Sequence, residues 1–161
     1  MIIGIDPGTS GALVLLHDDG KFCDHLLMPT IKVGSGNRVN GAAIAGWIGQ
    51  WRNSYGLNGT GWDTYLERVG AMPKQGVSST FTFGHAAGLV EGVVTGAGIP
   101  LTLVTPQAWK KAAGLIGTDK DAARSRAIQL YPELRILDAK GKGQAIADAI
   151  LIARFGRGLS V

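Results

Sequence analysis

Three acidic residues stand at positions that a structural role alone explains poorly. Asp6 ends an Ile-rich segment directly before a Pro-Gly pair, and Glu67 lies inside a second apolar segment. Asp148 shares one stripe of a predicted helix with the apolar residues Ala145, Ile152 and Phe155. A buried carboxylate without a partner is costly, so these acids need a compensating charge. Oxygen ligands without a His or Cys cluster favour Mg²⁺ or Mn²⁺ over Zn²⁺ for that role.

Each acid also has a purely structural interpretation, and these alternatives stay open at the level of sequence. Asp6 can form a turn by bonding the next backbone amides. Glu67 can belong to an edge strand or to an ion pair, although its neighbour Arg68 points to the opposite face of a strand. Asp148 can form a buried salt bridge. If instead the three acids meet at one end of a sheet, two divalent ions about 3.5–4 Å apart could hydrolyse a phosphodiester.

The positive charge of the chain is concentrated near its C-terminus. The net charge is +4 and the isoelectric point about 9.4. Residues 107–142 hold eight Lys or Arg and four acids, whereas the other 125 residues balance to zero. Such a region is typical of a polyanion-binding surface, or else of a solvated helical face. The candidate phosphate contacts are Lys74, Lys110, Lys111, Lys120, Arg124, Arg126, Lys140 and Lys142.

The pattern of apolar residues, glycines and prolines predicts the elements that position these acids. Strands are expected at residues 1–6, 12–16, 22–28, 64–69 and 101–104. Helices are expected at residues 40–51, from 79 or 80 to 95, from 105–106 onward, at 119–131 and at 144–155. The segments 29–38 and 70–79 are expected to be loops, since they are polar and rich in Gly, Pro and Ser.

This order of elements predicts an α/β fold with a five-stranded mixed sheet and helices on both faces. Residues 1–161 form one domain, because no linker or internal repeat divides them. The single Cys23, the absence of a signal peptide and the absence of a long apolar run predict a cytoplasmic protein without membrane contact. The GTSG turn lacks the ending of a phosphate-binding loop, so no nucleotide cofactor is expected.

Six blocks of the sequence, in order along almost the whole chain, resemble the RuvC-type Holliday-junction resolvases, in particular their phage and prophage members. They are IIGIDPGTSGALVLL, YLERV, TFGHAAGLVEGVV, PLTLVTPQAWKKAAGL, DKDAARSRAIQLYP and IADAILIARFG. The resemblance implies a ribonuclease H-like fold, a homodimer, two Mg²⁺ ions with Mn²⁺ as substitute, and cleavage of four-way junctions and other branched DNA. By motif position, Asp6, Glu67 and Asp148 are the catalytic and metal-binding carboxylates, with Asp6 between both ions.

Two departures from this family bear on activity. The family usually carries a further acid or His shortly before its last Asp, where this chain has Gly143, Gln144 and Ala145. Gln144 is the candidate substitute, through its side-chain carbonyl. The family also places an aromatic wedge just after the strand Glu, near Gly70 here. Candidate residues for opening the junction are Met72 and Phe81, because an inserted apolar side chain can unstack bases.

Two hypotheses of different classes follow. The first is a structure-selective, metal-dependent endodeoxyribonuclease that nicks junctions as a dimer. The second is a junction-binding protein with weak or no nuclease activity, since a fourth metal ligand is missing. A nuclease acting on flaps, forks or single-stranded ends is a third option, because one fold hosts many chemistries.

Overall fold

The computed structural model describes residues 1–55, 61–70, 76–119 and 121–161. Its seven strands are β1 (Ile2–Asp6), β2 (Ala12–Leu16), β3 (Phe22–Leu27), β4 (Thr30–Val33), β5 (Gly36–Val39), β6 (Asp63–Glu67) and β7 (Leu101–Val104). Its helices are α1 (Gly41–Tyr55), α2 (Val77–Gly96), α3 (Pro106–Ala112), α4 (Ala122–Leu130), the short 3₁₀ helix η1 (Arg135–Asp138) and α5 (Lys140–Gly156).

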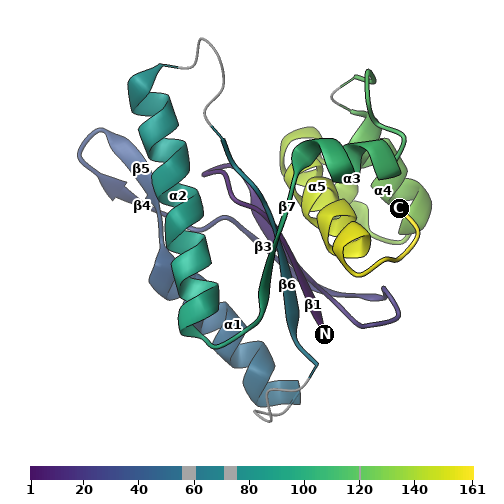
Figure 1. The fold of residues 1–161 in the computed structure, drawn as a ribbon, viewed down its shortest axis with the longest axis horizontal. Coiled ribbons are helices and arrows are strands. Elements are labelled where there is room, and N and C mark those ends of the chain that lie inside the picture. The colour runs from purple at the N-terminus through teal and green to yellow at the C-terminus, as the bar shows by residue number, and fades with distance from the viewer. Residues whose placement is uncertain (56–60, 71–75, 120) are drawn as a thin grey trace.

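The central sheet has five strands in the order β3-β2-β1-β6-β7. β1, β2 and β3 run antiparallel to one another, whereas β6 and β7 lie parallel to β1. Figure 1 shows α1 and α2 on one side of this sheet and α3, α4 and α5 on the other. The predicted fold class, a five-stranded mixed sheet covered on both faces, is therefore confirmed.

The alternation of side chains along β1 divides the core into two layers. Ile3 and Ile5 point toward α1 and α2, where they pack with Ile44 and Val90. Ile2 points the other way, into a second apolar cluster built mainly from α5. Because successive residues of a strand alternate between faces, Asp6 lies on the same face as Ile2. The last residue of β1 is thereby directed toward the α5 side of the sheet.

Helix α5 crosses β1 at a glycine that no larger residue could replace without movement. A Cβ added to Gly4 would lie 2.6 Å from the Cβ of Ala153 and 2.9 Å from its backbone nitrogen. The other residues of α5 at this contact are small as well, since Ala149 is fully buried beside the strand. Because of this close approach, α5 packs directly against β1 and β2. Asp148 of α5 then lies near the carboxyl end of β1.

The structure corrects two expectations about secondary structure. The segment 29–38 is not a loop, because β4 and β5 pair as an antiparallel hairpin around Gly34 in the left-handed region. This hairpin is almost wholly exposed and shows no alternation of burial, so the usual signal of a strand is missing. Helix α5 starts at Lys140, four residues before the expected position. Its Gly143 lies where a Cβ would approach the Leu137 carbonyl oxygen to 2.6 Å.

No helix within the described residues is long and apolar enough to cross a membrane.

Candidate active site

Two of the three acids lie at the carboxyl ends of neighbouring parallel strands. In the register of β1 and β6, Ile5 lies beside Leu66, and both side chains belong to the core under α1 and α2. The next residue of each strand, Asp6 and Glu67, therefore points to the opposite face, toward α5. Parallel pairing thus places both carboxylates on one face and at one edge of the sheet.

Helix α5 supplies the third acid from above this edge. Ala145 and Ile152, on the same stripe as Asp148, are buried, and Asp148 itself is only partly accessible. The prediction that Asp148 faces inward is therefore confirmed. The sequence predicted one acid at the end of a strand and one in an apolar helical stripe. It placed Glu67 inside a strand, whereas in the structure β6 ends at Glu67.

The three carboxylates stand in an environment that disfavours their charge. Burial, together with the nearby charges of Asp148 and Glu67, raises the pKa of Asp6 to about 7. Burial likewise raises the pKa of Asp148 to about 6 and shifts the pKa of Glu67 upward. The positive charge of Lys110 offsets part of the increase in the pKa of each of the three acids. Lys110 therefore lies within electrostatic reach of all of them.

Neutral hydrogen-bond donors orient two of the acids. The indole N–H of Trp109, a fully buried residue of α3, donates to Glu67 Oε2 at 2.7 Å. The side-chain amide of Gln144 donates to Asp148 Oδ1 at 3.0 Å. This orientation leaves the buried Gln144 Oε1 without a hydrogen-bond partner among the described residues. An unsatisfied buried oxygen beside a carboxylate is the kind of group that a cation or a water would satisfy.

None of the three acids takes part in an ion pair with a described residue. Arg68, the sequence neighbour of Glu67, is exposed and forms no such pair. The salt-bridge interpretations of Glu67 and Asp148 are thus contradicted for the described part of the chain.

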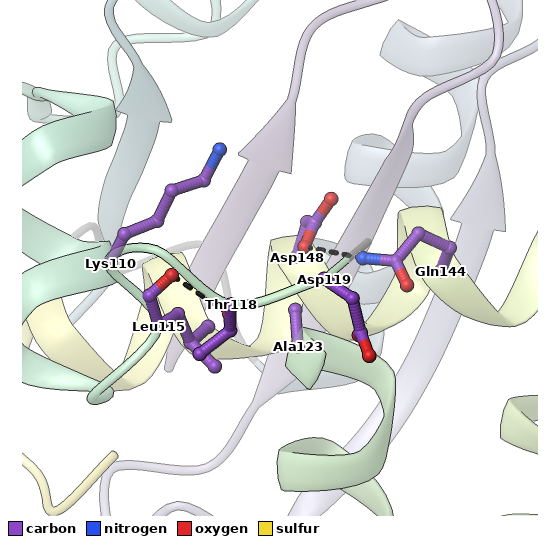
Figure 2. A pocket seen from close by; sticks show the side chains of 7 residues that line it. All are labelled: Lys110, Leu115, Thr118, Asp119, Ala123, Gln144 and Asp148. Carbon is purple, nitrogen blue, oxygen red and sulfur yellow. Dashed lines mark hydrogen bonds between the residues drawn. The ribbon is translucent and has the colours of Figure 1, made fainter. Parts of the chain in front are cut away.

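A cavity of about 350 Å³ opens beside Asp148 (Figure 2). Lys110 enters it from α3, whereas Gln144 and Asp148 come from α5. Asp119 also lines it, and a neighbouring cavity of about 440 Å³ is lined by Asp6, Asp148 and Asp121. Sequence reasoning missed Asp119 and Asp121, which precede α4 and stand two residues apart.

The site fits a divalent cation by the chemistry of its donors. It offers carboxylate oxygens, an unsatisfied amide oxygen and a surplus of negative charge, which are the preferences of Mg²⁺. Among the residues that the structure describes, no three His, Cys, Asp or Glu side chains are arranged to hold a metal ion as they stand. Side chains must therefore adjust for an ion to bind.

The basic residues expected to contact phosphate are distributed unevenly. Lys111 of α3, and Lys140 and Lys142 at the start of α5, are exposed. Arg124 is largely buried, donates to the Leu137 carbonyl and pairs with Asp121, and Arg126 donates to Gln129 and to the backbone oxygen of Val161. These two arginines thus have structural partners. Lys74 and Lys120 lie outside the described residues.

Of the two predicted wedge residues, the structure describes one. Phe81, in the second turn of α2, is 67% exposed, with its ring 6.2 Å from that of His85. Phe83 is only partly accessible and reaches toward the turn after β1. Met72 lies outside the described residues. Phe81 is therefore the wedge candidate whose ring is available at the surface.

Comparison with known structures defines the fold class as RuvC-like, within the ribonuclease H-like folds. A structure of RuvC from Thermus thermophilus matches with a TM-score of 0.56 at 15% identity, covering 98% of this chain and 95% of that one. The T. thermophilus RuvC in complex with a Holliday junction substrate matches with a TM-score of 0.62 at 15% identity, covering 98% and 94%. No protein-family model and no curated protein matches the sequence. The predicted RuvC-like fold is confirmed by these neighbours.

Proposed function

We propose that this protein is a metal-dependent endodeoxyribonuclease that cuts Holliday junctions and other branched DNA. The observation that carries the proposal is the meeting of three acids without ion pairs at one edge of a RuvC-like sheet. Structural acids of a folded protein are normally compensated, whereas a cluster with raised pKa values is typical of a functional site. The T. thermophilus neighbour bound to a Holliday junction supports the class of substrate.

Asp6, Glu67 and Asp148 would hold the metal, and Gln144 Oε1 would offer a further oxygen. Two Mg²⁺ ions, or Mn²⁺ in their place, would supply activation of water and of the scissile phosphate. Trp109 fixes one oxygen of Glu67 by its hydrogen bond and leaves the other oxygen free of it. Lys110 keeps a positive charge beside the acids, where it can orient a phosphate group.

The exposed lysines near the cavity would hold the DNA backbone. Lys140 lines the cavity that also holds Asp6 and Asp148, Lys142 lines a cavity beside Ser10, and Lys111 is exposed on α3. Contacts of this kind are electrostatic and independent of sequence, so binding should weaken steeply with salt. Lys74 and Lys120 remain candidates from the sequence alone.

Symmetric cutting of a junction needs two active sites, so we propose that the protein acts as a homodimer. Four glycines of α2 at intervals of four residues are exposed, and a Cβ on any of them would meet no described atom within 4 Å: Gly84, Gly88, Gly92 and Gly96. These glycines do not serve helix–sheet packing within the chain, so a second copy is the favoured neighbour. Light scattering after gel filtration would measure the mass and test this arrangement.

The decisive experiment uses a labelled four-way junction incubated with Mg²⁺ or Mn²⁺. Paired nicks with the wild type, and none with Asp6→Asn, would support the nuclease. A panel of flaps, forks and single strands, tested in parallel, would identify the preferred substrate. Intact junctions at every metal concentration would overturn the nuclease proposal.

The second hypothesis, a junction-binding protein with little or no nuclease activity, also has an observation in its favour. Ala145 stands in the segment where the family carries a further ligand, and the described side chains form no complete metal site as they stand. Junctions that are retarded in a gel but uncut would support this alternative. Restored cleavage in Ala145→Asp would then assign the loss to the missing carboxylate.

A further inference from the structure

The even charge balance outside the C-terminal region conceals a local separation of charge. Residues 25–62 and 68–90 contain five Lys or Arg and not one Asp or Glu. They build the β4–β5 hairpin, α1 and the first half of α2. Of the acids elsewhere in the chain, Asp24 lies inside β3, where Trp47 and Trp51 of α1 donate to it, and Glu91 lies in the second half of α2. The hairpin and the start of α2 therefore form an acid-free surface with a positive charge.

This surface contains a cavity of about 250 Å³ between the hairpin and the N-terminal half of α2. Arg38 and Asn37 line it from β5, and Ser78, Thr82 and His85 line it from α2. No carboxylate lines it, and Arg38 is exposed and forms no ion pair with a described residue. The cavity thus gathers one permanent cation and several hydrogen-bond donors.

The turn after β1 separates this cavity from the active site. Thr9 lines the hairpin cavity and also a second cavity, which it shares with Ser10. Ser10 in turn lines the acidic cavity together with Asp6 and Asp148. Three cavities therefore follow one another around a single turn at the carboxyl edge of β1. A DNA strand bound at Asp6 and Asp148 would reach the hairpin cavity after crossing this turn.

We propose that the cavity between the β4–β5 hairpin and α2 binds a backbone phosphate of the DNA strand that leaves the active site. This inference rests on the proposed function and adds a contact outside the C-terminal basic region. The guanidinium of Arg38 suits a phosphate because its planar N–H groups can donate in pairs. The hydroxyls of Ser78 and Thr82 and the ring of His85 can donate as well. Phe81, at the cavity wall, offers a ring on which the adjacent base can stack.

The test measures binding of a fluorescent four-way junction by anisotropy, in Ca²⁺ and with Asp6→Asn as the background to prevent cutting. Arg38→Ala should weaken binding, and the slope of log affinity against log salt should become smaller by about one. The wild type should then lose about threefold more affinity than the variant between 50 and 200 mM salt. Ser78→Ala should act in the same direction with a smaller effect.

Lys21→Ala is the matched control for the loss of one positive charge. Lys21 is 80% exposed and lies in the β2–β3 turn, at the opposite edge of the sheet from Asp6. Its removal should leave the affinity and the salt slope unchanged. A uniform change in both variants would attribute the effect to net charge and overturn the inference.

Junctions with single methylphosphonate substitutions locate the contact. Removing the charge of one phosphate beside the cleavage position should weaken wild-type binding, and the same substitution should not weaken binding of Arg38→Ala further. Equal losses for both proteins at every position would overturn the inference. If the wild type binds and cuts junctions while Arg38→Ala behaves identically, only this inference fails. If the wild type binds no DNA, the proposed function fails with it.

Discussion

The two edges of the central sheet carry acids in opposite circumstances. At the amino edge, Asp18 accepts from the N-terminal ammonium at 2.9 Å and pairs with Arg157 at 3.1 Å, and Arg157 also pairs with Asp63 at 3.2 Å. At the carboxyl edge, Asp6, Glu67 and Asp148 have no ion pair with a described residue. Asp63 and Glu67 begin and end the same strand, β6. Residue type is therefore a poor guide to role, and the partner of each acid separates the structural acids from those for which we propose a catalytic role.

The largest difference between the two edges of the sheet is expected in the rate of junction cleavage. Asp6→Asn should reduce junction cleavage by more than about 100-fold, since even residues that only support a metal ligand cost about 10- to 100-fold. Asp63→Asn, the matched change at the other edge, should cut junctions at the wild-type rate. Single-turnover rates on a labelled junction would measure both. Similar rates for the two variants would contradict the division of the sheet into functional and structural edges.

The second prediction concerns the contact that brings the third acid to its edge. Gly4→Ala should lower the free energy of unfolding by about 3 kcal/mol, because the new methyl group collides with α5. The surviving folded fraction should cut poorly, since α5 carries Asp148. Gly49→Ala, on an open face of α1, is the control and should be neutral or stabilising. Denaturant unfolding followed by cleavage assays would test both, and an unharmed Gly4→Ala would refute the close approach.

The third prediction uses the raised pKa values of the acids. An acid with a higher pKa in the folded than in the unfolded state holds its proton better when folded, so stability falls as pH rises through that interval. Since the pKa of Asp6 is about 7 and that of Asp148 about 6, the metal-free protein should lose stability between about pH 4 and pH 7. Asp148→Asn should regain about 2 kcal/mol at pH 7.

Unfolding in EDTA across this pH range would check the prediction, and Mg²⁺ should then stabilise the wild type more than Asp148→Asn. A wild-type stability that is flat with pH would contradict it. The amino edge provides the contrast, because its acids already have cationic partners. Asp63→Asn should therefore not gain stability at pH 7.

The arrangement of the acids could be predicted from sequence because it follows from local periodicity. Alternation along β1 and β6 and the apolar stripe around Asp148 indicate which way each side chain points. The bond from Trp109 to Glu67 joins residues 42 positions apart, and no periodicity reports such a pair. The β4–β5 hairpin was not predicted, because strands that are exposed on both faces need no alternation of apolar and polar residues. The glycines at the α5 contact were visible as residues, but only the packing distinguishes Gly4 from the open glycines of α2.

The fourth prediction tests the hydrogen bond that replaces an ion pair at Glu67. Trp109→Phe should raise the Mg²⁺ concentration for half-maximal cleavage by about tenfold, because a carboxylate that loses its orienting donor binds metal less well. Trp51→Phe is the matched control. The indole N–H of Trp51 also donates to a carboxylate, Asp24 Oδ2, at a distance of 2.8 Å, but this pair does not belong to the candidate site. Mn²⁺ binding by calorimetry should show the same tenfold difference without DNA. Equal metal affinity in both variants would show that Trp109 does not contribute to metal binding.

The smallest effect is expected for stability at the amino edge. Asp63→Asn breaks one ion pair that is partly exposed on both sides, and such pairs contribute less than about 1 kcal/mol. Arg157 keeps Asp18 as a partner after the change, which reduces the loss further. Chemical unfolding at low and high salt would measure it, and salt should diminish the difference from the wild type. A loss of several kcal/mol would contradict this prediction. It would mean that the ion pairs at the amino edge contribute far more to the stability of the sheet than partly exposed pairs normally do.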